Sequence, residues 1–74
     1  MIKNKTFQVS LLEKAQECVP PNILFSSVLM DVLGVSYSGA HRRIRDETQL
    51  TLKEAVTIAI HYDISLDRLI DEFK

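Results

Sequence analysis

The chain of 74 residues contains one cysteine, two prolines, two glycines and no tryptophan. Because Cys18 is alone, no disulfide can form within the chain, and a lone cysteine suits a reducing compartment better than an oxidising one. His41 and His61 are the only histidines, and no cysteine or histidine pair has the spacing of a zinc site. A domain this small, with neither disulfide nor metal, must be stabilised by close helix packing, with or without a partner chain.

Other absences narrow the class of protein. No apolar run approaches the roughly 18 residues that span a membrane, and the basic N-terminus is not followed by the apolar stretch of a signal peptide. The sequence has no phosphate-binding loop and no cysteine–histidine pair at catalytic spacing, and a helical chain of this size leaves little room for a small-molecule pocket. We therefore expect one cytoplasmic, non-enzymatic domain over residues 1–74, without cofactor, metal or membrane contact.

Apolar residues recur at intervals of three and four through most of the chain, which is the spacing of one face of an α-helix. A first helix is expected to follow an N-cap at Thr6 and to stop before Pro20-Pro21. A second is expected to start at an N-cap at Asn22 and to end at Gly34, because glycine readily adopts the left-handed conformation that closes a helix. The predicted inward positions of these two helices are Phe7, Leu11, Leu12, Ala15, Cys18, Phe25, Val28, Leu29, Val32 and Leu33.

Three more helices are expected in the second half of the chain. Ser36 is a suitable N-cap for a helix over Ser36–Arg45, in which only Ala40 and Ile44 point inward. Thr51 and Glu54 form a capping-box pattern, and Ser65 is expected to cap the last helix. The stripes of these last two helices are Leu52, Ala55, Val56 and Ala59, then Leu66, Leu69, Ile70 and Phe73. The alternation of Ile58, Ile60, Tyr62 and Ile64 also allows a short strand, although the capping box favours the helix.

The most informative segment is the junction of the second and third helices. Gly34-Val35-Ser36 is a short turn containing glycine, and such a turn joins two helices at a steep angle. The helix before it is apolar, whereas the helix after it is small, polar and basic outside its thin apolar stripe. One α-helix fits the DNA major groove, which is about 12 Å wide, so the pattern predicts a helix that reads double-stranded DNA.

Each exposed group of this helix is assigned a contact with DNA. Ser36 and the first backbone amides are expected to hold a phosphate, and Tyr37 to bond a phosphate or stack on a sugar. Ser38 and His41 are expected to reach base edges. Arg42 is assigned to guanine or phosphate, and Arg45 to phosphate. The predicted DNA-binding residues are Ser36, Tyr37, Ser38, His41, Arg42 and Arg45.

These residues also have plainer interpretations. The three arginines of the helix can form a solvated face, His41 can be an ordinary surface residue, and Tyr37 can pack the helix against the core. Cys18 is predicted to be a small core residue, and His61 a structural residue or a partner of the helix dipole. The acidic residues near the C-terminus lack the spacing of a calcium loop and are expected to be solvated.

The charge balance bears on the choice between these interpretations. The net charge is −1, which is low for a nucleic-acid-binding domain. Residues 1–45 carry six basic and three acidic residues, a net charge of +3, whereas residues 46–74 carry three basic and seven acidic residues, a net charge of −4. One end of the molecule is therefore expected to face phosphate while the other avoids it.

The segments Val28–Arg45 and Thr51–Ile70 together resemble the Cro and phage-repressor-like helix-turn-helix family of bacterial transcriptional regulators. The resemblance covers about residues 22–70, and it implies an all-α, five-helix, lambda-repressor-like DNA-binding domain. It implies DNA contacts at Ser36, Tyr37, Ser38, His41 and Arg42, and core positions at Leu29, Leu33, Val35, Ala40 and Ile44. Three sites depart from the family pattern: Met30 replaces a small residue, Arg43 an apolar one, and Asp46-Glu47 a glycine-containing turn.

These observations predict a sequence-specific double-stranded DNA-binding domain of a bacterial transcriptional regulator. Such regulators pair on two half-sites, so a homodimer is expected, with Ile70 and Phe73 as an apolar edge. Because the sequence ends directly after a helix, the chain is also considered as the N-terminal piece of a longer protein. The alternative is a protein-interaction module that keeps the fold without binding DNA, which the low net charge and Asp46-Glu47 favour.

Overall fold

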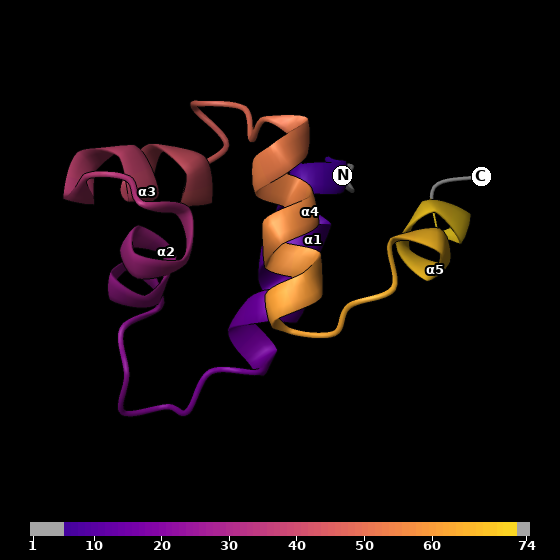
Figure 1. The fold of residues 1–74 in the computed structure, drawn as a ribbon, viewed down its shortest axis with the longest axis horizontal. Coiled ribbons are helices and arrows are strands. Elements are labelled where there is room, and N and C mark those ends of the chain that lie inside the picture. Colours follow the sequence, from indigo (N-terminus) through magenta and orange to yellow (C-terminus); the bar gives the residue numbers. More distant parts are fainter. Residues whose placement is uncertain (1–5, 73–74) are drawn as a thin grey trace, which may run out of the picture.

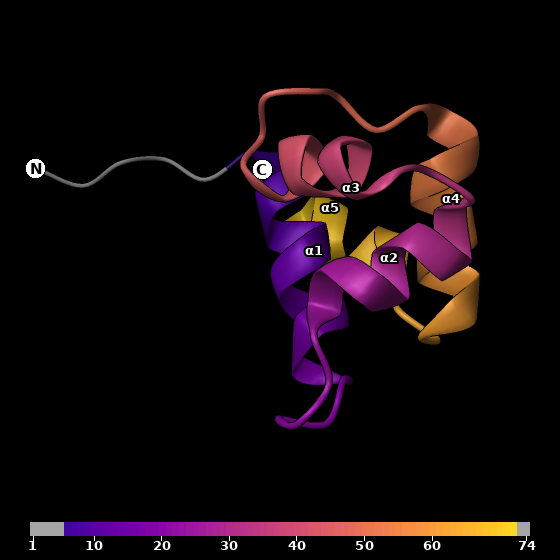
Figure 2. The same cartoon turned by 90° about the vertical axis from the view of Figure 1, so that its left-hand side faces the viewer.

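The computed structural model describes residues 6–72, and every regular element in that range is an α-helix (Figures 1 and 2). The five helices are α1 (Phe7–Glu17), α2 (Phe25–Leu33), α3 (Tyr37–Ile44), α4 (Leu52–His61) and α5 (Leu66–Asp71). The all-α prediction is therefore confirmed. The alternative of a strand around Ile58–Ile64 is wrong, because α4 continues to His61 and a turn follows it. Phe73, which was placed on the apolar edge, lies outside the described residues.

Four of the five helices begin at a side chain that accepts a hydrogen bond from the first turn. The side chains of Thr6, Ser36 and Ser65 each accept from the amide three residues ahead. Thr51 and Glu54 form the complete capping box that the sequence predicts. These starts are local, since the donor and the acceptor lie within one turn of helix.

The predicted start of α2 at Asn22 is wrong. The helix begins at Phe25, and its N-cap is Leu24, which makes no capping hydrogen bond through its side chain. Asn22 lies instead inside a turn in which the amide of Ile23 donates to the carbonyl of Pro20 (3.1 Å). The two prolines fix their own backbone angles and so favour this turn, which delays the start of α2.

Three helices end in the same way, with one residue in the left-handed conformation. Gly34 ends α2 with φ 67°, while Asp46 follows α3 with φ 63° and Asp63 follows α4 with φ 55°. The next amide then bonds back to the last turn: Val35 to Met30, Glu47 to Arg42 and Ile64 to Ala59. This is the hydrogen-bond pattern of a Schellman motif, in which glycine is the usual residue. Two of the three positions thus carry an aspartate where glycine would be less strained.

The largest fully buried side chains of the core come one from each of four helices, and Leu12, Ala15, Phe25 and Ala40 complete the cluster. Leu11 of α1, Leu29 of α2, Ile58 of α4 and Leu69 of α5 are fully buried. In Figure 1, α4 crosses in front of α1, with α2 and α3 on one side and α5 on the other. The third helix contributes only Ala40 to the fully buried set, so α3 lies on the core rather than within it.

Four positions of the predicted apolar stripes are exposed: Cys18, Leu52, Val56 and Ile70. Cys18 is exposed, because α1 ends at Glu17 and the thiol turns back to donate to the carbonyl of Lys14 (3.5 Å). Leu52 is 82% exposed, because it opens α4 before the helix reaches the core. The burial of α4 instead depends on Ile58 and Ala59, with Ala55 packed against the core.

The side-chain amide of Gln8 joins α1 to the connection between α3 and α4. Its Nε2 donates to the carbonyls of Arg43 and Thr48 (both 2.9 Å), and its Oε1 accepts from the amide of Leu50 (2.7 Å). One side chain therefore satisfies three backbone groups, all 35 or more residues away along the chain. Gln8 takes the place of a helical or strand partner for the carbonyl of Thr48 and the amide of Leu50, while the carbonyl of Arg43 also accepts from the amide of Asp46 (3.2 Å).

Replacement of Gln8 with alanine is expected to lower the free energy of unfolding by about 2 kcal/mol, because the carbonyl of Thr48 and the amide of Leu50 lose their partner and the carbonyl of Arg43 loses one of two donors. Urea denaturation followed by circular dichroism measures the change. Gln16→Ala, in the same helix but exposed, is the matched control and should change stability by less than about 0.5 kcal/mol. Equal effects of the two substitutions would contradict the role given to Gln8.

Replacement of Asp63 with glycine is expected to raise the free energy of unfolding by about 0.5 kcal/mol, because glycine adopts a positive φ without a Cβ clash. The same change at Asp67, in the first turn of α5, should instead lower stability by about 0.5–1 kcal/mol, since glycine weakens a helix. Thermal unfolding of the two variants tests the opposite signs, and a loss of stability in Asp63→Gly would show that the left-handed turn is not strained.

Candidate nucleic-acid interface

The helix α3 rests on the molecule through a narrow apolar stripe. Ala40 is fully buried, and Val35 and Ile44 are partly buried against the core. Met30 and Leu33 of α2 pack against the same core. The core positions implied by the resemblance are therefore buried or partly buried, as expected. The three residues Gly34-Val35-Ser36 connect α2 to α3, so the opposite face of α3 is turned to solvent.

The first turn of α3 presents polar groups at the surface. The hydroxyl of Ser36 accepts from the amide of Gly39 (3.1 Å) and lies 3.4 Å from the hydroxyl of Ser38. The amides of Tyr37 and Ser38 have no acceptor within the helix, because the first donors of any α-helix lack one. Both serines are exposed, so the amino-terminal end of α3 offers hydroxyl and amide donors to a ligand.

Tyr37 and His41 lie one turn apart on α3 and contact each other. Their ring centroids are 4.3 Å apart, and their planes are tilted by 52°. Tyr37 is 64% exposed, whereas His41 is half-buried and its Nε2 is covered without a hydrogen-bond partner. Tyr37 is thus the outer residue of this pair, and its ring packs on the half-buried ring of His41. Tyr37 packs on its own helix rather than against the core.

The three arginines of this segment have different surroundings. Arg42 is exposed, and its side chain forms no ion pair within residues 6–72. Arg45 donates to both carboxylate oxygens of Glu47, at 3.0 and 3.4 Å, and both side chains are more than half exposed. Arg43 turns away from the solvent face. Only Arg42 is therefore an unpaired cation on the exposed face of α3.

Arg43 links α3 to the start of α4. Its Nε and Nη2 donate to the two oxygens of Glu54 (3.0 and 3.1 Å), and its Nη1 donates to the carbonyl of Gly39 (2.9 Å). Only 14% of the Arg43 side chain and 17% of the Glu54 side chain are exposed. Glu54 also accepts from the amide of Thr51 (3.1 Å), so one carboxylate closes the capping box and binds the arginine. This pair stands where the resembled family has an apolar contact.

The hydrogen bonds from Arg43 hold the pKa of Glu54 below the ordinary value of a glutamate. Burial acts in the opposite direction, while the amide of Thr51 and the positive charge of Arg43 lower the pKa further. The carboxylate is therefore ionised at neutral pH, and the contact is a charge-assisted, bidentate one.

Carboxylates border the other end of α3. Asp46 accepts from the hydroxyl of Thr6 (3.2 Å), and Glu47 holds Arg45. Both acidic residues are exposed. The surface around α3 is thus polar and uncharged at its amino-terminal end, cationic at Arg42 and mixed in charge at its carboxyl-terminal end.

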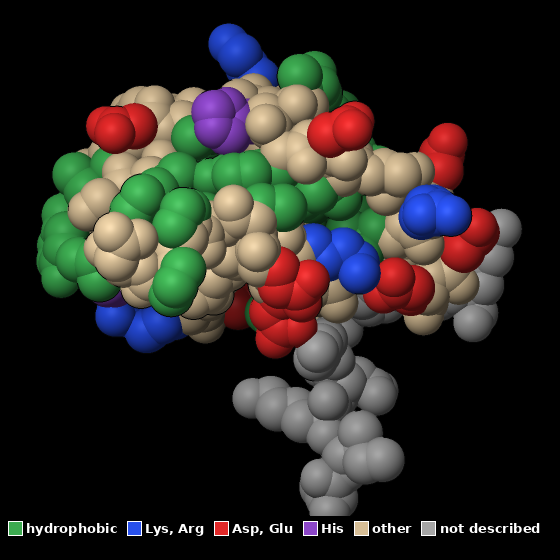
Figure 3. Space-filling model, turned by 90° about the horizontal axis from the view of Figure 1, so that it is seen from below, with side chains coloured by type: hydrophobic (Ala, Val, Ile, Leu, Met, Phe, Trp, Pro, Cys, Tyr) green, Lys and Arg blue, Asp and Glu red, His purple; other side chains and the backbone are tan. Residues whose placement is uncertain are grey.

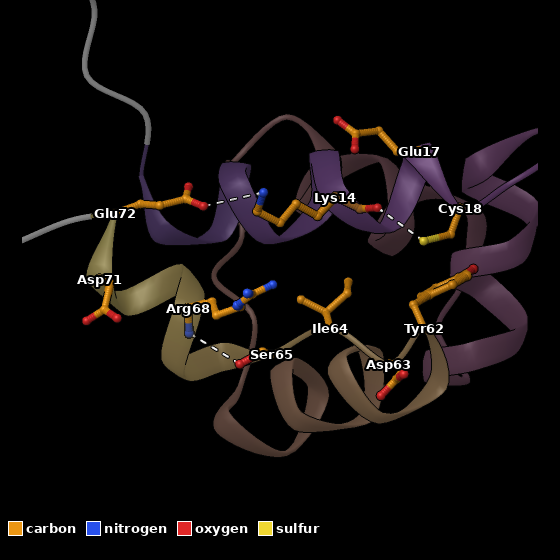
Figure 4. A pocket seen from close by; sticks show the side chains of 10 residues that line it. All are labelled: Lys14, Glu17, Cys18, Tyr62, Asp63, Ile64, Ser65, Arg68, Asp71 and Glu72. Atoms are coloured by element: carbon orange, nitrogen blue, oxygen red, sulfur yellow. Dashed lines mark hydrogen bonds and ion pairs between the residues drawn. The ribbon is translucent and has the colours of Figure 1, made fainter.

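A separate hollow lies on another part of the described surface. It has a volume of about 580 Å³ and lies between the end of α1 and α5, where Lys14 and Glu72 form an ion pair at 3.4 Å (Figure 4). Its ten lining residues include Cys18 and Tyr62 but no histidine. Burial, aided by the neighbouring Cys18, raises the pKa of the Tyr62 hydroxyl. Within residues 6–72, no three acidic, cysteine or histidine residues gather as metal ligands, and no helix is long and apolar enough to cross a bilayer.

Replacement of Glu54 with glutamine keeps a capping-box acceptor but removes the charge that balances Arg43. A carboxylate with a lowered pKa stabilises the fold only while it is ionised, so the parent should lose stability as the pH falls below about 4.3. Glu54→Gln should be less stable by about 2 kcal/mol at pH 7 and should lose this part of the acid dependence.

Urea denaturation at pH 7 and pH 3 measures both effects. The matched control is Glu17→Gln, which removes an exposed carboxylate and should change stability by less than about 0.5 kcal/mol at pH 7. A stability difference between parent and Glu54→Gln that is the same at both pH values would show that the ion pair does not stabilise the fold.

Comparison of the chain with protein-family models, with curated proteins and with solved structures finds no match.

Proposed function

We propose that the chain is a sequence-specific double-stranded DNA-binding domain of a bacterial transcriptional regulator, with α2 and α3 as its helix-turn-helix. The observation that carries this proposal is the exposed face of α3, which has no carboxylate within the helix and includes the unpaired Arg42. The apolar attachment of α3 consists of Ala40 and Ile44, and Arg43 adds an ion pair with Glu54 of α4. The opposite side, with Tyr37, Ser38 and Arg42, is exposed. An isolated helix face of this kind fits the major groove.

The contacts follow from where the side chains lie. The open amides at the start of α3, with the hydroxyls of Ser36 and Ser38, are suited to a phosphate at the positive end of the helix dipole. Tyr37, supported by His41, is suited to a phosphate or a sugar. Arg42 is suited to guanine, whose two acceptors in the major groove match a guanidinium. We assign base reading to Ser38 and Arg42, because Nε2 of His41 is covered by protein.

Arg45 requires a different argument, since Glu47 already holds it. Ion pairs as exposed as this one contribute only about 0–1 kcal/mol, so a phosphate can compete for the guanidinium. Arg45 can therefore bind a phosphate only by leaving Glu47, and the contact with DNA must offset the loss of that ion pair.

A second candidate function is a protein-interaction module with the same fold and no DNA binding. The observation in its favour is the pair of exposed carboxylates, Asp46 and Glu47, beside the end of α3, together with the net charge of −1. Phosphate would be repelled from this end of the helix. The two functions differ in one property, because only DNA binding depends steeply on salt.

The affinity of the chain for a mixed-sequence duplex is expected to fall as salt rises, because each phosphate contact releases counterions. Arg42→Ala should weaken binding and relax the preference for guanine at one position, whereas Arg45→Ala should weaken binding to all sequences and reduce the slope of log affinity against log salt by about 1. Fluorescence anisotropy at several salt concentrations measures both. Arg68→Ala is the matched control, since Arg68 is an exposed arginine on α5, and it should bind as the parent does.

Two further variants sharpen this test. Glu47→Gln frees Arg45 and should tighten binding by up to about tenfold, which corresponds to 1.4 kcal/mol. Arg42→Ala combined with Arg45→Ala should bind more weakly than either single variant. A selection from random duplexes then shows whether one sequence is preferred. An affinity that does not change with salt, or an equal loss in Arg68→Ala, would rule out DNA binding through α3 and favour the protein-interaction module.

A further inference from the structure

One flank of α4 carries large apolar side chains that the fold leaves at the surface. Leu52, Val56 and Ile60 follow one another at intervals of four residues and are 82%, 36% and 76% exposed. They form a stripe about 12 Å long, because each helical residue rises 1.5 Å. The one carboxylate of the helix, Glu54, is turned toward α3 and held there by Arg43, so the stripe itself is free of negative charge.

The stripe runs into a hollow at one end and projects at the other. The hollow measures about 400 Å³ and lies between the start of α1 and the start of α4. Five of its ten lining residues are apolar (Phe7, Leu11, Leu50, Leu52 and Ala55) and five are polar (Thr6, Gln8, Asp46, Gln49 and Thr51). Leu52 belongs to both the stripe and the hollow. Ile60 lies at the opposite end of the stripe, where its side chain projects into solvent. A projecting side chain and a hollow at opposite ends of one stripe are what a self-complementary surface requires.

We propose that a second copy of this chain packs on the α4 stripe, antiparallel, about a two-fold axis that passes near Val56. In this register, Ile60 of each copy enters the hollow beside Leu52 of the other, and the two Val56 side chains meet at the axis. The β-branched valine, the smallest of the three side chains, lies at the centre and lets the two helices approach closely.

The charges near the stripe suit the same arrangement. Lys53 and Asp63 are both exposed, one in the first turn of α4 and the other just beyond its last turn. An antiparallel pair brings Asp63 of one copy toward the amino-terminal end of α4 in the other, where Lys53 and the helix dipole are positive. The two Lys53 residues are offset by about six positions, or about 9 Å along the helices, which limits their repulsion.

The size of the surface sets the strength of the pair. A stable interface buries about 800 Å² on each partner, and one helix flank with a shallow hollow provides less than that. We therefore expect a weak dimer, with a dissociation constant on the order of tens of micromolar or higher. The dimer can form without DNA. A failure to dimerise would therefore leave the proposed DNA binding untouched, and a failure to bind DNA would leave the dimer untouched.

A second apolar area lies over the α1–α2 connection, on the face seen in Figure 3. There Ile23 is 46% and Leu24 72% exposed. Neither Ile23 nor Leu24 lines either of the two hollows described above, so the area does not suggest its own partner. It supplies the matched control for the α4 stripe, because Leu24 is nearly as exposed as Ile60.

Sedimentation equilibrium of the full chain at increasing concentration tests the proposal. The parent should pass from the 8.4 kDa of one chain toward twice that mass, and Ile60→Glu should remain at the lower mass at every concentration. Leu24→Glu should associate as the parent does. Both substitutions are at exposed positions, and circular dichroism verifies that each variant is folded. A parent that stays monomeric at millimolar concentration, or an equal loss in Leu24→Glu, would overturn the proposal.

Cross-linking tests the register independently of affinity. In a Cys18→Ser background, Val56→Cys should form a disulfide between copies under copper–phenanthroline oxidation, because the two positions meet at the axis. A mixture of the Leu52→Cys and Ile60→Cys chains should yield the mixed dimer in preference to either like pair. Cross-linking that is no faster for Val56→Cys than for Gln16→Cys, an exposed site on α1, would overturn the antiparallel register.

Discussion

The side-chain amide of Gln8 is the contact on which the position of α3 depends. It holds the carbonyl at the end of α3 and the backbone that leads into α4, and it does so from the first helix of the chain. The ion pair of Arg43 with Glu54 continues this link from α3 to α4, and the hydroxyl of Thr6 adds a bond to Asp46. A helix with so few apolar contacts is thus placed by hydrogen bonds, whose geometry is more directional than that of packing.

Much of the fold could be predicted because its signals are local. The caps at Thr6, Ser36 and Ser65 and the capping box at Thr51 act within a single turn, so the residue types at fixed offsets suffice. The errors concern burial and competition. Cys18 and Leu52 have helical spacing, but each lies at the end of its helix and beyond the core. Asn22 is a residue type that caps helices well, but it lies within the turn that the amide of Ile23 and the carbonyl of Pro20 close.

The candidate interface shows the same division. Spacing alone places Ser36, Ser38 and Arg42 together on an exposed face, and the structure brings them together there. The contact of Tyr37 with His41 joins residues four apart on a helix and could have been read from that spacing. The partner of Arg43 could not be predicted from spacing, because Glu54 lies on another helix and its approach depends on the packing of α3 against α4. A charged residue at an expected apolar position, followed by a capping-box glutamate, is the signal that could suggest such a pair.

The largest fully buried side chains come from α1, α2, α4 and α5, whereas α3 adds only Ala40 to the fully buried set. Detachment of α3 would break its polar contacts with Gln8 and Glu54 and expose Ala40 and Ile44, but it would remove none of those four large side chains from the core. Local opening of that kind requires less free energy than global unfolding. The helix that we propose to enter the major groove is then also the element that can adjust its angle with the least change to the four helices that carry it.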